Sequence, residues 1–84
     1  MTKEEMAQFI EIDHPVTFNS VRVDFDTEQH TVGFFDKFDD AEQLKEANQW
    51  RFIPNNLANE YQDSKSIQYS IVIDGDEVSK LTLL

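Results

Sequence analysis

The stretch "SIQYSIVIDGDEVSKLTLL", residues 66–84, decides the fold class of this chain. Every second residue from Ile67 to Ile73 is apolar or aromatic, so these side chains share one face of an extended strand. Asp74-Gly75 follows as a strong short-range turn signal, and Val78 begins a second β-favouring run. We therefore predict a C-terminal β-hairpin.

Two registers are compatible with this hairpin. A two-residue turn places Val78 opposite Ile71, and it leaves Leu81 and Leu83 on the other face. A three-residue turn with a Gly bulge brings Leu81 beside Ile67 instead. Either register leaves a face rich in Ile that another element must cover.

A second hairpin is predicted upstream. Val21–Asp26 alternates apolar and polar residues, and Thr31–Phe35 resumes β-favouring residues after the polar segment "TEQH". Before it, Val16 and Phe18 also alternate with polar residues after Pro15, which stops any helix. The phase slips by one position around Asn19-Ser20, which indicates a bulge or two short strands.

The stretch "QWRFI" predicts a further short strand. Alternation places Trp50 and Phe52 on one face and Arg51 and Ile53 on the other, and Pro54 ends the strand. Trp50 then has two interpretations. It packs in the core, or it belongs to a recognition surface, since Trp and Arg are enriched at interfaces.

Short helices are predicted between these strands. Thr2 and Glu5 have the spacing of a capping box, although "AQFIEID" also alternates, so helix and strand both stay open for the N-terminal segment. Asp39 or Asp40 can cap a helix over "AEQLKEANQ", and Asn56 can cap a two-turn helix over "LANEYQD".

These elements define an α+β fold: an antiparallel sheet of about four to five strands with one to three short helices on one face. A chain of 84 residues is expected to form a single domain, residues 1–84. Its 39% hydrophobic residues, among them seven Phe, are typical of a folded globule.

The composition speaks against catalysis and against cofactors. The chain has no Cys, so disulfides and thiolate chemistry are excluded. With two Gly and no Gly-x-Ser-x-Gly motif, we expect neither a phosphate-binding loop nor a serine nucleophile. The histidines, His14 and His30, fall in predicted turns. No segment approaches the roughly 20 apolar residues of a membrane span. We expect a cytoplasmic protein that is not an enzyme.

The best candidate for a metal site is the stretch "DFDTEQH". Asp24, Asp26, Glu28 and His30 recur at every second position and would project to one side of an extended chain. The predicted hairpin needs a turn within "TEQ", which scatters them. We therefore expect no metal here.

The charge balance points to a partner class. Seventeen Asp and Glu against seven Lys and Arg give a formal charge of -10. This surplus repels nucleic acid and anionic membranes at long range and attracts cationic surfaces. Our hypothesis is a non-catalytic interaction module that docks a basic protein through a carboxylate-rich face. The candidate carboxylates are Asp24, Asp26, Glu28, Asp36, Asp39 and Asp40.

Candidate aromatic anchors for this docking are Phe34, Trp50 and Tyr61. Phe34 and Phe35 are adjacent on a strand and must point to opposite faces, so one is exposed unless a helix or a second chain covers it. Two alternatives stay open. One is a homodimer in which a sheet edge pairs with a second copy. The other is a small-ligand site lined by Trp50, Arg51 and Tyr61.

Overall fold

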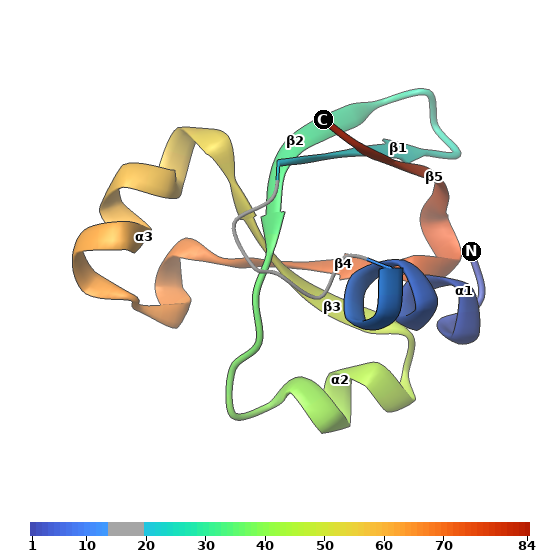
Figure 1. The fold of residues 1–84 in the computed structure, drawn as a ribbon, viewed down its shortest axis with the longest axis horizontal. Coiled ribbons are helices and arrows are strands. Elements are labelled where there is room, and N and C mark those ends of the chain that lie inside the picture. The colour runs from blue at the N-terminus through green and yellow to red at the C-terminus, as the bar shows by residue number, and fades with distance from the viewer. Residues whose placement is uncertain (14–19) are drawn as a thin grey trace.

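The computed structural model of the chain describes residues 1–13 and 20–84. One antiparallel sheet contains five strands in the order β4-β3-β2-β1-β5 (Figure 1). The strands are β1 (Val21–Phe25), β2 (His30–Phe35), β3 (Gln49–Pro54), β4 (Ile71–Asp74) and β5 (Val78–Leu83). The expectations for His14, Pro15, Val16, Phe18 and the phase slip at Asn19 lie outside the described residues.

Short helices connect or precede the strands. They are α1 (Lys3–Ala7), η1 (Gln8–Asp13), α2 (Ala41–Glu46), η2 (Asn55–Leu57), α3 (Ala58–Ser64), η3 (Ile67–Tyr69) and η4 (Gly75–Glu77). The N-terminal segment is helical. Its predicted capping box forms, because the Thr2 hydroxyl accepts the Glu5 N–H at 3.1 Å and the Glu5 carboxylate accepts the Thr2 N–H at 2.9 Å.

The other two predicted caps do not form. Asp40 sits at the N-cap position of α2, but its side chain makes no capping hydrogen bond and turns to Arg51 instead. Asn56 falls inside the 3-10 helix η2, so Leu57 takes the N-cap position of α3. The charge-assisted hydrogen bond from Arg51 to Asp40 Oδ2 is stronger than a bond from a neutral backbone N–H, although Asp40 Oδ1 is buried with no partner recorded in the described part of the chain.

The predicted α+β class and single antiparallel sheet are confirmed, including two successive C-terminal strands around Asp74-Gly75. The hairpin pairing of these strands needs correction. β4 pairs with β3, and β5 pairs with β1, so neither predicted register occurs. The residues before β4 also differ, because Ile67 and Tyr69 lie in η3 rather than in a strand.

The cause lies in the turn itself. The Asp74 carboxylate accepts the Asp76 N–H at 3.0 Å and caps the 3-10 helix η4 where a tight hairpin turn was expected. This helical turn sends β5 away from β4 and toward β1, where Val23 faces Leu81. A turn with strong hairpin propensity is thereby used as a corner between two edges of the sheet.

This corner also shows that the sheet is rolled. In a flat sheet of this order, β4 and β5 would lie about 19 Å apart, at about 4.8 Å per strand. From Asp74 to Val78 the chain advances only about 8 Å at the rise of a 3-10 helix. The two edges therefore converge at η4, and the sheet curls into an open barrel in which β4 leads directly into β5 (Figure 1).

Helices cover both faces of the sheet, which corrects the prediction of a single covered face. Inside the curve, Met6 of α1 packs in one core with Trp50 and Phe52. On the opposite face, Tyr61 of α3 covers Phe34 and Ile53. Figure 1 places α1 and α3 on different sides of the sheet. The predicted alternation of β3 is confirmed, because the adjacent residues Phe52 and Ile53 belong to separate cores.

Candidate functional site

Most of the positive charge is already paired within the chain. Among the described residues, at least five of the seven Lys and Arg residues form ion pairs with carboxylates of the chain itself. The pairs are Lys3–Glu46 at 3.9 Å, Arg22–Asp24 at 3.1 Å, Lys37–Glu11 at 3.6 Å, Lys45–Glu11 at 3.0 Å and Arg51–Asp40 at 2.8 Å. The surplus carboxylates therefore face solvent with little cationic compensation.

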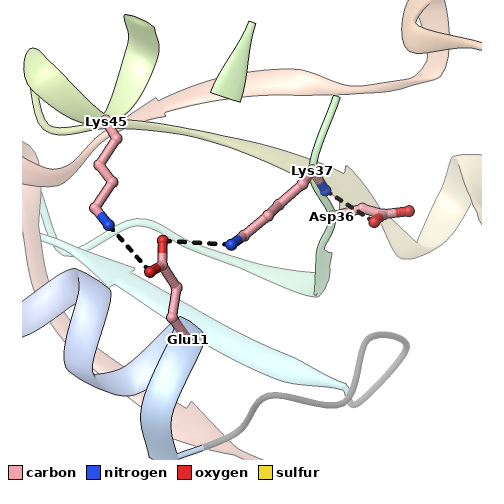
Figure 2. Close-up of polar contacts among 4 residues, drawn as sticks. All are labelled: Glu11, Asp36, Lys37 and Lys45. Atoms are coloured by element: carbon pink, nitrogen blue, oxygen red, sulfur yellow. Dashed lines mark hydrogen bonds and ion pairs between the residues drawn. The ribbon is translucent and has the colours of Figure 1, made fainter. Parts of the chain in front are cut away.

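Glu11 is a structural member of this set. It extends from η1 between Lys45 on α2 and Lys37 in the loop after β2, whose own N–H donates to Asp36 (Figure 2). Burial alone would raise the pKa of Glu11, but the hydrogen bond from Lys45 and the charges of both lysines lower it below its ordinary value. Glu11 thus joins three segments of the fold and is not available to a partner.

The predicted carboxylates have unequal surroundings. Three are engaged inside the chain: Asp24 with Arg22, Asp36 with the Tyr61 hydroxyl and the Lys37 N–H, and Asp40 with Arg51. The hydrogen bond from Arg51 lowers the pKa of Asp40. By contrast, Asp26, Glu28 and Asp39 are exposed, and no partner for their carboxylates is recorded among the described residues.

These carboxylates do not form one continuous face. Asp24 lies opposite His30 at the start of β2, whereas Asp36 follows Phe35 at its end. The six residues of β2 separate the two groups by about 17 Å at about 3.3 Å per residue. The structure therefore divides the predicted docking surface into two parts.

The predicted aromatic anchors are buried. Phe34 is 5% exposed, Trp50 7% and Tyr61 3%. Trp50 lies in the inner core, and its indole N–H donates to Asn48 at 3.0 Å. Tyr61 lies in the outer cluster, so Trp50, Arg51 and Tyr61 do not line a shared site. Trp50 therefore packs in the core, and Tyr61 of α3 covers Phe34.

Tyr61 provides a test of this outer cluster. Burial, followed by its hydrogen bond to Asp36, raises the pKa of Tyr61 to about 12 from an ordinary value of 10.0. Because the folded pKa is raised, the stabilisation is complete below pH 10 and is lost between about pH 10 and 12. We expect a loss of about 2 kcal/mol of unfolding free energy across this window.

The free energy of unfolding is measured in urea at several alkaline pH values. The absorbance of the tyrosine phenolate, followed over the same pH range, reports the ionisation of tyrosine. The matched variant is Tyr61→Phe, which keeps the ring packing and removes the hydroxyl. Its unfolding free energy should fall less steeply over the same window. Parallel pH profiles for both chains would contradict the assignment.

A different group of carboxylates is brought together by the fold. The turn between β1 and β2 meets η4, because the Asp26 N–H donates to the Glu77 carbonyl at 2.9 Å. This end of the barrel carries five carboxylates, which we call the acidic end: Asp26, Glu28, Asp74, Asp76 and Glu77. None of the five forms an ion pair in the described part of the chain.

The nearest cationic groups to the acidic end are few. Lys80 faces Asp24 across the β1–β5 register. The Met1 ammonium donates to the Gly75 and Val78 carbonyls at 2.9 and 2.6 Å. These groups offset part of the negative potential. The Asp76 carboxylate accepts a hydrogen bond from the Asn48 amide and the Asp74 carboxylate accepts the Asp76 N–H, whereas no partner is recorded among the described residues for the carboxylates of Asp26, Glu28 and Glu77.

Sequence reasoning missed Asp74, Asp76 and Glu77 as candidates, because "DGDE" has a complete explanation as a turn. The available signal was the density of charge, with carboxylates at three of four positions in a segment expected to be exposed. What the sequence does not show is that η4 lies beside the β1–β2 turn, some fifty residues earlier in the chain.

An open depression of about 440 Å³ is lined by Lys37, Phe38, Asp39, Asp40, Lys65 and Ile67. Its mixed charges give no defined ligand chemistry. Within residues 1–13 and 20–84, no three His, Asp or Glu side chains are arranged to hold a metal ion.

Comparison with known proteins gives no relative: no protein-family model, no curated protein and no solved structure matches this chain. Among the described residues, no helix is both long enough and apolar enough to cross a membrane.

Proposed function

We propose that this protein is a non-catalytic interaction module that docks a basic protein partner through the acidic end. The observation that carries the proposal is the joining of two acidic turns, Asp26–Glu28 and Asp74–Glu77, on one end of the barrel. The chain's own cations are mostly occupied elsewhere. The negative charge of the acidic end is therefore available to a cationic partner.

The mechanism is electrostatic steering followed by close contact. A formal charge of -10 accelerates encounter with a cationic surface and disfavours nucleic acid and anionic lipid. The cytoplasm suits such a module, because a fold without Cys gains nothing from an oxidising compartment. Exposed carboxylates contribute mainly to the association rate and to its salt dependence.

The alternatives receive less support. Two copies carrying a formal charge of -10 each repel one another, which opposes a homodimer at low salt. A small-ligand site at Trp50, Arg51 and Tyr61 is disfavoured because the two rings lie in separate cores on opposite faces of the sheet. Catalysis has no supporting constellation in the described residues.

The proposal predicts a specific effect of charge neutralisation. The triple variant Asp26→Asn, Glu28→Gln and Glu77→Gln should weaken partner binding by roughly tenfold, as expected for the loss of three exposed ion pairs. The measurement is affinity capture from a lysate of the source cells, washed at low salt and eluted in rising salt steps. Wild-type protein should release basic proteins at moderate salt, and the variant at lower salt.

The control changes the same number of charges elsewhere. Glu42→Gln, Glu60→Gln and Asp63→Asn neutralise exposed carboxylates on α2 and α3, outside the two turns that form the acidic end. This control should behave like the wild type. Equal weakening in both triple variants would show that total charge matters and the acidic end does not. If neither triple variant changed the salt concentration at which captured proteins are released, and if release did not depend on salt at all, the docking proposal would be overturned.

A further inference from the structure

The outer edge of β4 has unpaired backbone groups. β4 pairs with β3 in a register that places Trp50 opposite Ile73 and Arg51 opposite Val72. The Gly75 N–H donates to the Asn48 carbonyl at 2.7 Å, which fixes the pair 48/75 as hydrogen-bonded. Because hydrogen-bonded pairs alternate along an antiparallel ladder, Ile71 and Ile73 bond to β3, while Val72 and Asp74 direct their N–H and C=O outward.

No partner is recorded for these outward groups within the described residues. β4 is the last strand on its side of the sheet. Ile71 and Val72 are 41% and 42% exposed, although they are consecutive and so lie on opposite faces of the strand. The edge is therefore apolar on both faces and open along its backbone.

The other edge of the sheet is different. β5 contains an extra residue at Ser79, where its register with β1 shifts between Asp24 and Phe25. It also carries the exposed Lys80. A bulge and a lysine are devices that prevent an edge from accepting another strand. β4, with the sequence Ile-Val-Ile-Asp, has neither within its first three residues. The contrast indicates that the β4 edge is open for binding.

We propose that an extended segment of the basic partner adds to the β4 edge as a sixth, antiparallel or parallel strand. Main-chain hydrogen bonds to Val72 and Asp74 hold the segment, and its apolar side chains cover Ile71. Its Lys or Arg residues lie near Asp74 and Asp76, which continue from the strand into the acidic end. This inference rests on the proposed function and names the kind of segment that the partner contributes.

Charge complementarity selects this occupant over a second copy. Pairing two β4 edges would bring together chains that each carry a formal charge of -10, whereas a cationic segment meets carboxylates at the end of the strand. Alternating apolar and basic residues satisfy both requirements at once, because Ile71 and Asp74 lie on opposite faces of β4 and neighbouring side chains of the added strand do the same. A segment of this pattern is therefore the expected ligand.

The probe for the test is a soluble seven-residue peptide of alternating Val and Lys, acetylated and amidated. It is titrated into isotope-labelled protein and followed by amide chemical shifts and hydrogen exchange. Binding should shift resonances of β4 and protect the amides of Val72 and Asp74, which exchange freely without peptide. A second peptide carries an N-methyl group at every backbone amide, which removes all its backbone hydrogen-bond donors and keeps its charge. It should bind at least tenfold more weakly.

The matched protein variants are Val72→Pro and Val72→Thr. Proline removes the outward N–H without breaking a bond to β3, whereas threonine keeps that donor and the β-branched shape. Val72→Pro should lose at least tenfold in affinity, and Val72→Thr should bind like the wild type. Trp50 fluorescence checks that the neighbouring strand is intact. If Val72→Pro does not fold, the N-methylated peptide still decides the question on the wild-type protein.

Three outcomes would overturn the inference: equal binding of both peptides, peptide binding that leaves β4 unchanged, or protection of Val72 that grows with protein concentration in the absence of peptide. The last would show pairing with a second copy. Salt-step capture with Val72→Pro separates this inference from the proposed function. In one result, Val72→Pro still captures the partner and the acidic-end substitutions still weaken that capture. This result would support docking through the acidic end and would exclude binding at the β4 edge.

Discussion

Replacing Gly33 by Ala is expected to destabilise the fold by about 3 kcal/mol or more, the upper part of the range for overpacked cores. Gly33 lies on β2 opposite Pro54 of β3. A Cβ atom at this position would lie 2.1 Å from the Ile53 carbonyl oxygen and 2.7 Å from the Phe52 ring. The first contact is with backbone, so no rotation of a side chain relieves it.

The consequence reaches both cores, because β2 and β3 form the centre of the sheet. Phe52 belongs to the inner core and Ile53 to the outer cluster, and each is fully buried. Separating the strands to accommodate a methyl group disturbs their pairing between Phe34 and Ile53. A domain of this length has an unfolding free energy on the order of 4–13 kcal/mol, so the expected loss is a large share.

Urea unfolding followed by Trp50 fluorescence measures this effect. The control is Thr31→Ala on the same strand, which is half-buried and lies outside this close approach. It should lose less than about 1 kcal/mol. A Gly33→Ala protein that unfolds at the same urea concentration as the control would show that the strands separate easily at this point.

Local patterns were sufficient to predict most of the strands. Alternation identified β1, β2 and β3, including the division of Trp50 and Ile53 between two faces. The N-terminal capping box also formed as its spacing indicates. These features depend on residues within one element, where the periodicity of side chains determines which ones are buried together.

The strands that pair with β4 and β5 could not be predicted from such local patterns. The Asp74-Gly75 signal marks a reversal, but the Asp74 side chain bonds to the Asp76 N–H and makes that reversal helical. Which strand then accepts β5 depends on the curvature of the whole sheet. Turn propensity is a local quantity, whereas the choice between β4 and β1 as a neighbour is not.

The division of the predicted carboxylates into paired and exposed groups has a related cause. Asp36 and Asp40 looked like surface charges, yet their partners are Tyr61 and Arg51, which lie 25 and 11 residues away. Acidic residues that pair across the fold cannot be distinguished by sequence from those that face solvent. The acidic end likewise depends on contact between turns that are distant in the chain. The sequence shows only that acidic residues are clustered in each turn, and it does not show that the two turns meet.

Asn48→Ala is expected to destabilise the protein by about 3 kcal/mol, because this residue combines an unusual backbone conformation with a buried hydrogen-bond network. Asn48 is 6% exposed and has a φ angle of 57°, in the left-handed region where Asn and Gly are favoured. Alanine at this angle is strained by about 1 kcal/mol or more. The remainder comes from its side-chain partners.

The Asn48 amide joins three parts of the chain. Its oxygen accepts the Trp50 indole N–H at 3.0 Å, and its nitrogen donates to the Met1 carbonyl at 2.9 Å and to Asp76 at 3.0 Å. Truncation leaves the Trp50 donor buried without its partner, which costs about 1–3 kcal/mol. The network also holds η4 against β3, so the position of the acidic end depends on it.

Asn48→Gly separates the two contributions, because glycine adopts the left-handed conformation without strain and lacks the amide. Asn48→Gly should therefore lose about 1 kcal/mol less than Asn48→Ala in urea unfolding, and both should shift the Trp50 emission. If the two variants were equally stable, backbone strain would contribute nothing. If both matched the wild type, the amide network would not support the corner between β4 and β5, and the hydrogen bond from the Gly75 N–H to the Asn48 carbonyl would be left as the contact that positions η4.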